Sequence, residues 1–502
     1  MRKLVYFIPF FILFTLNVGA NDKTQSPKLK TFLNNFSKDH FKTFLKKPYS
    51  SAAPRIIKQS GFNSYFKIKN NLSNKAEIGW EDNIRTLVEP SLKRLIKNIY
   101  EIKDNQNDTN SLKPTYWTAY WWSTYNGQLG ARLGLRNFLM LFDWKDKYQY
   151  IKDNPISSFI KRDLVRKLSP SEKYDLLVGD PNLSLTKYMW KRGEDSMYNY
   201  GQIFNWDGLC DGLAIASVTL PRPSKAITVY SRDGNIPIKF YPEDIKALGS
   251  LLYSNSRPPY RMIGTRCDNR LPEIDENGRF LARECFNINP GAFHLTLVNQ
   301  IGLAKRAFVM DSVSSAEVWN YPVVGYTFKY FNPQTLEEVE KMENGIIPYE
   351  DFTKDKFSKY RSKKVAKIIG VQADITFLKD RIATFKDVET DKHNEPGLVI
   401  YRYDLELDKN GKIIGGEWYH GHHPDFLWVT QKGIKAKGPY DNEIKGTWNP
   451  TKELIPATWA NVAIKSSVGG EVAAPIVEAL FNLSHEGVDG LNPNQKSFNK
   501  RR

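Results

Sequence analysis

The pattern of apolar and polar positions changes along the chain from a helical period to an alternating one. Apolar residues three or four positions apart predict a helix over 84–100. The stretch Ser169-Pro170-Ser171-Glu172 predicts a helix start, because it combines an N-cap, a first-turn proline and a glutamate at the third position. That helix continues over 173–178, and further helices are predicted at 185–190, at 242–253 and in a segment that begins at Cys210.

Alternating segments dominate the chain beyond the Cys210 segment. Residues 226–230 and 236–240 predict two strands of a hairpin around Asp233-Gly234-Asn235. Residues 292–299 and 306–313 are the next predicted strands, and 320–430 favours more antiparallel sheet. We therefore expect an α+β fold with a helical N-terminal part.

The first twenty residues predict an export signal. Arg2 and Lys3 precede an apolar run over 4–16, and Val18-Gly19-Ala20 supplies the small residues that a signal peptidase requires. The apolar run is short for a membrane-spanning helix. We therefore expect cleavage near Ala20 and a secreted or periplasmic protein.

The remaining chain divides by composition into three parts. Residues 21–75 are rich in Lys, Asn and Ser and are interpreted as a lead-in or pro-segment. Residues 76–440 are assigned to the main domain, and 441–502 to a C-terminal extension with a polar tail.

The charge balance is strongly basic. The full chain of 502 residues has a formal net charge of +17, which favours acidic protein substrates or an anionic envelope surface as partners. The basic residues are spread along the chain and form no nucleic-acid-binding motif. We expect no nucleic acid partner.

The three cysteines predict one disulfide and one thiol. Cys267 and Cys285 lie 18 residues apart around a polar segment, which is typical of a bridged surface loop in an exported protein. Cys210 is then left as the thiol. A thiol at a helix N-terminus has a lowered pKa in the field of the helix dipole, whereas the neighbouring Asp211 opposes ionisation.

A nucleophilic thiol requires a base, and the base requires a group that orients it. His294 lies in the predicted strand 292–299 and Asp311 in the next one. If these strands form a hairpin centred on Gly302-Leu303, His294 and Asp311 face each other on one side of the sheet. Cysteine on a helix followed by His and Asp on adjacent strands is the order of papain-like and transglutaminase-like thiol acyltransferases. The alternative is a structural strand histidine beside a strand-end aspartate.

Several stretches in this order resemble the transglutaminase elicitor family, which includes secreted oomycete transglutaminases and bacterial relatives. The resemblance runs from about Trp117 to Trp428 and implies that residues 76–440 form a catalytic domain of the transglutaminase-elicitor type. Its main blocks are 168–175, 206–210, 289–302, 308–311, 317–326, 415–418 and 423–428.

This resemblance implies a protein-glutamine γ-glutamyltransferase with a papain-like core, in which a nucleophile helix packs on an antiparallel sheet. Carried over to matching positions, Cys210 is the nucleophile, His294 the base and Asp311 its orienter. The thiolate would form a thioester with a glutamine side chain and pass the acyl group to a lysine or another primary amine. Two positions, Asp211 and Leu213, depart from the family pattern and put the substrate preference in doubt.

The oxyanion of this reaction needs hydrogen-bond donors. The backbone N–H of Cys210 is one candidate, and Gln202 or Trp206 is the second. No cofactor is required. The segment His420-Gly421-His422-His423 is interpreted as a structural or surface loop rather than a metal site, and Ca²⁺ is allowed by the acidic residues although no EF-hand loop is present.

Two other functions remain open from the sequence. The same three residues would serve a papain-like thiol peptidase or amidase acting on envelope peptides. The third alternative is an inactive surface or adhesion protein that retains the fold.

Overall fold

The computed structural model describes residues 76–104, 108–112, 116–269, 272–282, 285–314, 316–419 and 421–493. The predicted signal peptide, the lead-in segment and the end of the polar tail lie outside these residues. No helix within the described residues has the length and apolarity to cross a membrane.

Most of the predicted helices are confirmed, and several are longer than predicted. The start at Ser169 is a complete capping box: its hydroxyl accepts from the Glu172 N–H, and the Glu172 carboxylate accepts from the Ser169 N–H. The helices between 130 and 260 are α5 (Arg136–Leu139), α6 (Trp144–Asp153), α7 (Ile156–Lys161), α8 (Pro170–Val178), α9 (Ser184–Tyr200), α10 (Cys210–Thr219) and α11 (Pro242–Ser256). Near the C-terminus follow α14 (Ala457–Val468) and α15 (Ala474–Glu486).

The single helix predicted over 84–100 is wrong. The chain forms two short helices there, α3 (Ile84–Leu87) and α4 (Ile99–Asp104). Pro90 lies between them, and a proline has no N–H to donate and pushes its predecessor out of the helical region. The apolar residues at helical spacing are buried by tertiary packing instead.

The β-structure is antiparallel throughout the described residues. The main sheet has the order β11-β10-β9-β6-β5-β12-β4, with three short strands paired at its margins, and β2–β3 form the predicted hairpin. The strands of the main sheet are β4 (Tyr260–Gly264), β5 (Phe308–Asp311), β6 (Asn320–Phe331), β9 (Lys367–Leu378), β10 (Pro396–Leu407), β11 (Ile413–Gly415) and β12 (Phe426–Thr430). The remaining strands are β1 (Thr109–Ser111), β2 (Ile227–Tyr230), β3 (Pro237–Phe240), β7 (Glu338–Val339) and β8 (Ile347–Pro348), and the short helix α13 (Met342–Gly345) follows β7.

The strand predicted over 292–299 is wrong, because this segment is helical. Helix α12 (Pro290–Thr296) begins after Asn289, whose side chain accepts a hydrogen bond from the Gly291 N–H, and proline occupies the first turn. It continues as a π-helix over Leu297–Leu303. Every residue of α12 is buried, so the helix has no polar face, and the sequence pattern could not distinguish it from a buried strand.

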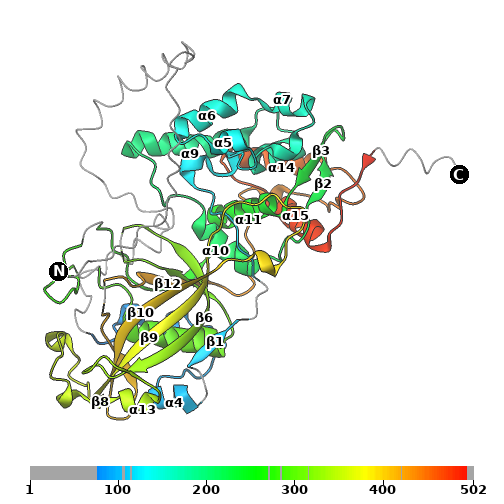
Figure 1. The fold of residues 1–502 in the computed structure, drawn as a ribbon. Coiled ribbons are helices and arrows are strands. Elements are labelled where there is room, and N and C mark those ends of the chain that lie inside the picture. The colour runs from blue at the N-terminus through cyan, green and yellow to red at the C-terminus, as the bar shows by residue number, and fades with distance from the viewer. Residues whose placement is uncertain are drawn as a thin grey trace. The chain divides into compact units, whose positions relative to one another are not determined.

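Two apolar cores fill the described part of the chain, and helix α10 belongs to the first of them. One core joins the helices between Trp117 and Tyr253 to α14 and α15, and the other joins α12 to the inner face of the main sheet. Helix α10 packs against α11 on one side and against β6 on the other (Figure 1). The cysteine at its first residue is therefore held between the helical part and the sheet.

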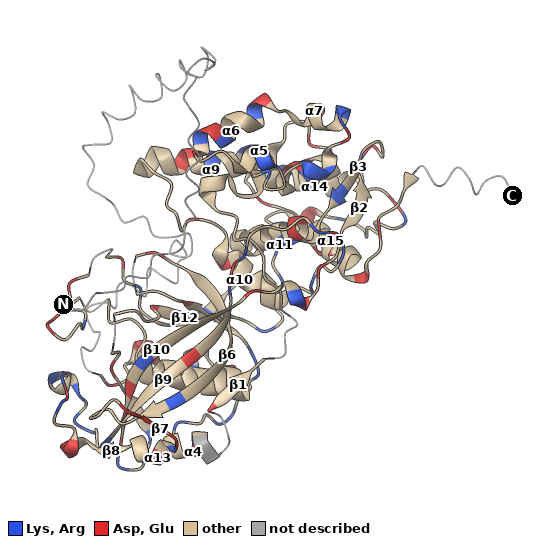
Figure 2. Ribbon diagram, viewed as in Figure 1, with Lys and Arg blue, Asp and Glu red and all other residues tan. Residues whose placement is uncertain are grey.

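Charged residues are spread over both parts of the chain rather than gathered on one element (Figure 2). Several ion pairs are fully buried in the helical part, among them Lys173–Asp244, with 2.6 Å between Nζ and Oδ2. Arg132 donates to both carboxylate oxygens of Glu172 within the same core. Removing one partner of such a pair would leave an uncompensated buried charge.

Candidate active site

Three backbone and packing features fix the start of helix α10. The N–H of Leu209 donates to the Trp121 carbonyl at 2.9 Å, which ties the residue before the helix to the aromatic segment 116–122. Gly208 lies against the Trp121 ring, where a Cβ atom would come within 2.4 Å of a ring carbon. Gly212 lies against the backbone of α11. Because these glycines admit close packing, Cys210 is placed at the helix start with little freedom.

The thiol of Cys210 contacts the beginning of strand β6. Its Sγ lies 3.8 Å from the Val318 carbonyl oxygen and 3.6 Å from Nδ2 of Asn320, which donates toward the sulfur. The Asn320 side-chain oxygen in turn accepts from Nε1 of Trp428 at 2.8 Å, so the amide is held in one orientation. Asn320 is the polar side chain beside the thiol that the sequence analysis missed.

The pocket around this thiol is mainly apolar and aromatic. Trp121 and Trp319 meet edge to face in its wall, with ring centroids 5.5 Å apart. Trp117, Thr118 and Trp121 of the aromatic segment 116–122 therefore form part of the pocket wall. The other lining residues are Leu213, Ala214, Ser217, Asn320, Tyr321, Pro322, Leu378, Lys379 and Asp380.

Burial makes Cys210 a neutral thiol at neutral pH. Desolvation, followed by the negative charge of Asp211, raises its pKa to about 12, and the hydrogen bonds from Asn320 oppose this shift. The expectation of a lowered pKa is wrong because burial outweighs the helix dipole, whereas the predicted effect of Asp211 is confirmed in direction. A reaction at this thiol therefore requires a group that takes its proton.

The predicted pairing of His294 with Asp311 is wrong. His294 lies in helix α12, whereas Asp311 ends strand β5 and pairs with Asn320 of β6. The His294 ring stacks on Phe328 at 4.0 Å between centroids, and its Nδ1 lies 3.0 Å from the hydroxyl of Tyr403. Its Nε2 is buried without a hydrogen-bond partner in the described structure, so no hydrogen bond joins His294 to Cys210 or to Asp311. Burial lowers the pKa of His294 to about 3.

Asp311 interacts electrostatically with Cys210. Its negative charge contributes to the raised pKa of the thiol, and its Oδ1 accepts from the N–H of Trp319, a residue of the pocket wall. Burial raises the pKa of Asp311 to about 7, against the opposing effects of the Trp319 N–H and Arg266. Its Oδ2 is buried without a hydrogen-bond partner among the described residues.

A second buried carboxyl group, that of Asp425, interacts with Asp311. Burial and the charge of Asp311 raise the pKa of Asp425 well above its ordinary value. Asp425 is held by the Cys267 N–H and by the side chain of Asn287. Because the two carboxyl groups interact, their titration belongs to the pair.

The two oxyanion candidates occupy different surroundings. Gln202 is exposed, and its carbonyl accepts from Ser196, while Trp206 stacks on Phe204 with centroids 5.7 Å apart. Neither residue lines the pocket of Cys210, and their role in the reaction stays a prediction. The Asn320 amide is the donor that the structure places next to the sulfur.

In the histidine-containing segment 420–423, His423 is part of the packed structure. Its ring stacks on Trp418, 5.1 Å between centroids, and is buried, while the exposed His422 lies near the Tyr401 ring. His420 lies outside the described residues. Across the described ranges, no three or more His, Cys, Asp or Glu side chains form a group that could hold a metal ion.

The predicted disulfide is confirmed. Cys267 and Cys285 are bonded, and Cys210 is the free cysteine. The bridge closes the polar loop between β4 and α12, and Cys267 also donates its N–H to Asp425, so the disulfide anchors the carboxyl pair from one side.

The fold and the site together define an α+β protein with an antiparallel sheet and a buried thiol at a helix start. A family model described as transglutaminase elicitor matches residues 190–438. Among solved structures, the crystal structure of the GP42 transglutaminase from Phytophthora sojae is 19% identical with a TM-score of 0.48, and the match covers 79% of this chain and 95% of that chain. No curated protein matches the chain.

Proposed function

We propose that this protein is a protein-glutamine γ-glutamyltransferase that uses Cys210 as its nucleophile. The observation that carries the proposal is the free thiol at the start of α10, held against β6 by the Asn320 amide inside the family match. A helix-borne cysteine facing an antiparallel sheet also supports the papain-like layout that the sequence suggested.

The reaction has two balanced steps. The Cys210 sulfur attacks the carboxamide carbon of a glutamine side chain, a thioester forms, and ammonia leaves with the proton of the thiol. A primary amine such as a lysine side chain then attacks the thioester and restores the thiol, whereas water would give glutamate. The aromatic wall formed by Trp121 and Trp319 favours the amine by excluding water.

We assign the proton-accepting role to Asp311 rather than to His294. A base with a pKa near the working pH is best suited to general acid–base catalysis, and burial raises the pKa of Asp311, which interacts with Asp425, toward that range. His294 is turned toward Tyr403 and Phe328. The Asn320 amide and the Cys210 backbone N–H would stabilise the oxyanion.

Asp380 is suited to receive the amine substrate. It lines the same pocket as Cys210 and accepts a hydrogen bond from the Tyr321 hydroxyl at 3.0 Å. A carboxylate at this position would attract the ammonium group of an acceptor lysine.

We further propose that the protein is exported and acts on protein substrates that carry glutamine and lysine, without a cofactor. The disulfide supports an oxidising compartment. An anionic envelope surface is the proposed location because of the basic charge of the chain.

Transfer of a fluorescent primary amine to casein tests this proposal. The wild-type protein should incorporate the amine and release ammonia, and Cys210→Ala should lower the rate at least about 1,000-fold, as expected for loss of a nucleophile. Thermal unfolding of both proteins is the control for folding. Peptide cleavage without amine incorporation would favour the thiol peptidase, and neither incorporation nor cleavage by the folded wild type would favour the inactive surface protein.

A further inference from the structure

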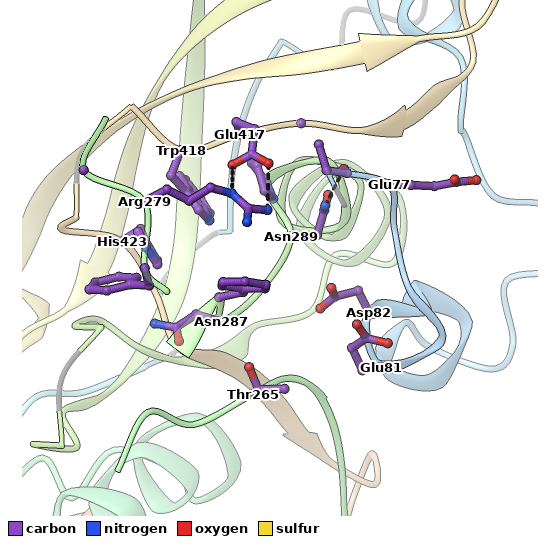
Figure 3. A pocket seen from close by; sticks show the side chains of 16 residues that line it. Glu77, Glu81, Asp82, Thr265, Arg279, Asn287, Asn289, Glu417, Trp418 and His423 are labelled. Carbon is purple, nitrogen blue, oxygen red and sulfur yellow. Dashed lines mark hydrogen bonds and ion pairs between the residues drawn. The ribbon is translucent and has the colours of Figure 1, made fainter. Parts of the chain in front are cut away.

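A cavity on the sheet side of the described structure is separate from the Cys210 pocket. It lies between the segment 76–82, the disulfide-closed loop and the segment 416–423, and holds about 660 Å³ outside protein atoms, with open solvent at its mouth included (Figure 3). Its lining shares no residue with the Cys210 pocket.

Three buried oxygen acceptors in its wall have no hydrogen-bond donor among the described residues. They are Oδ1 of Asp82, Oγ1 of Thr265 and Oδ1 of Asn287, and their residues are only 4%, 6% and 3% exposed. Figure 3 shows Asp82 and Thr265 with oxygen atoms turned toward the interior of the cavity. A buried acceptor without a donor costs free energy. A ligand that donates hydrogen bonds to these oxygen atoms would remove that cost.

The charged residues that line the cavity are mostly acidic, although the chain as a whole is basic. Arg279 is bound to both carboxylate oxygens of Glu417 at 2.9 Å, so its charge is neutralised within the wall. Asp82 has a second carboxylate, Glu81, beside it, and burial and the Glu81 charge raise the pKa of Asp82 well above its ordinary value. A cationic ligand would stabilise the ionised form of Asp82.

The opposite part of the lining is apolar and aromatic. Phe280, Phe286 and Trp418 all face the cavity. An alkyl chain gains free energy by covering such surface, whereas an inorganic ion gains none. The lining therefore suits a ligand with a cationic donor end and an apolar stem.

We propose that this cavity binds an aliphatic primary amine, with the ammonium group at Asp82 and the alkyl stem along the aromatic wall. This site is distinct from the proposed acyl-transfer site, and nothing in its argument depends on Cys210. A metal ion is disfavoured because the described residues contain no group of three or more His, Cys, Asp or Glu side chains that could hold one.

Calorimetric titration of the full-length Cys210→Ala protein with pentylamine and cadaverine tests the proposal. This background prevents covalent transfer, so the result does not depend on the proposed function. Both amines should bind, neutral 1-pentanol should bind at least about tenfold more weakly, and Asp82→Asn should weaken amine binding about tenfold or more. Titration in buffers of different ionisation enthalpy should show proton release on binding, because Asp82 ionises.

Matched variants distinguish amine binding in this cavity from a general attraction of cations to carboxylates elsewhere on the protein. Glu350→Gln removes an exposed carboxylate far along the chain and should leave the amine affinity unchanged, while Thr265→Val should weaken it by a smaller factor than Asp82→Asn. Unchanged affinity in a folded Asp82→Asn protein would overturn the proposal. So would binding of Ca²⁺ that displaces the amine and requires Asp82, or equal binding of amine and alcohol.

Discussion

Replacing Asp311 by asparagine is expected to lower kcat/KM for amine transfer about 100-fold or more, which is the usual range for loss of a general base. Asparagine keeps the oxygen that accepts from the Trp319 N–H, so the wall of the pocket should persist. The wild-type kcat/KM should rise with pH through about 7, since the carboxylate is the active form above its pKa, and this rise should be absent from the variant. Initial rates between pH 5 and 9 measure both effects.

His294→Gln is the matched comparison for that experiment. Because His294 forms no hydrogen bond with Cys210 or Asp311, activity per folded molecule should stay within about threefold of wild type. A large loss in His294→Gln together with a small loss in Asp311→Asn would restore the histidine as the base. A large loss confined to His422→Gln would instead assign the base to the exposed ring near Tyr401.

Gly212→Ala is expected to destabilise the protein by about 3 kcal/mol, at the upper end of what overpacking costs. A Cβ atom at this position would come within 1.9 Å of the Ser250 carbonyl oxygen and 2.6 Å of the Ser254 nitrogen. These are backbone atoms of α11 that no rotamer change can move. Helix α10 would have to shift away from α11, and the midpoint of thermal unfolding should fall by about 6 °C or more.

Gly469→Ala is the control for glycine replacement. Its backbone φ is −87°, which any residue adopts, and the nearest atom to a new Cβ lies 3.5 Å away. Its unfolding midpoint should stay within about 1 °C of wild type, because an unstrained surface substitution changes little. Equal midpoints for Gly212→Ala and wild type would contradict the close packing of α10 on α11.

Local signals were sufficient to predict much of the fold. The capping box at Ser169, the turn at Asp233-Gly234-Asn235 and the spacing of Cys267 and Cys285 each specify a structure from neighbouring residues. The antiparallel sheet between 320 and 430 followed from alternating patterns in long strands such as β9 and β10. These features depend on few contacts that are distant in sequence.

The error at 292–299 arose where local signals were weak. A segment buried on all sides carries no periodic polar face, so helix and strand are equally compatible with it. Asn289-Pro290 was the available clue, since an N-cap followed by proline is typical of a helix start. The hairpin that paired His294 with Asp311 depended on this strand and fails with it.

The surroundings of the thiol could not be predicted because they depend on tertiary contacts. Asn320 reaches Cys210 across 110 positions of sequence, and Trp428 fixes its amide from a further strand. Asn320 does lie in the block 317–326 of the family resemblance, but nothing in that block indicates a contact with the thiol. The raised pKa of Cys210 likewise follows from tertiary packing, because burial of the thiol is its main cause.

The central claim is that Cys210 forms a thioester with a glutamine side chain. Intact-mass and peptide-level mass spectrometry after incubation with a short glutamine peptide, quenched in acid, measures this directly. We expect an adduct equal to the peptide less one ammonia on the peptide that contains Cys210, and its loss on addition of a primary amine. The absence of this adduct in a folded protein that nevertheless transfers amine, or an adduct on any other residue, would contradict the claim.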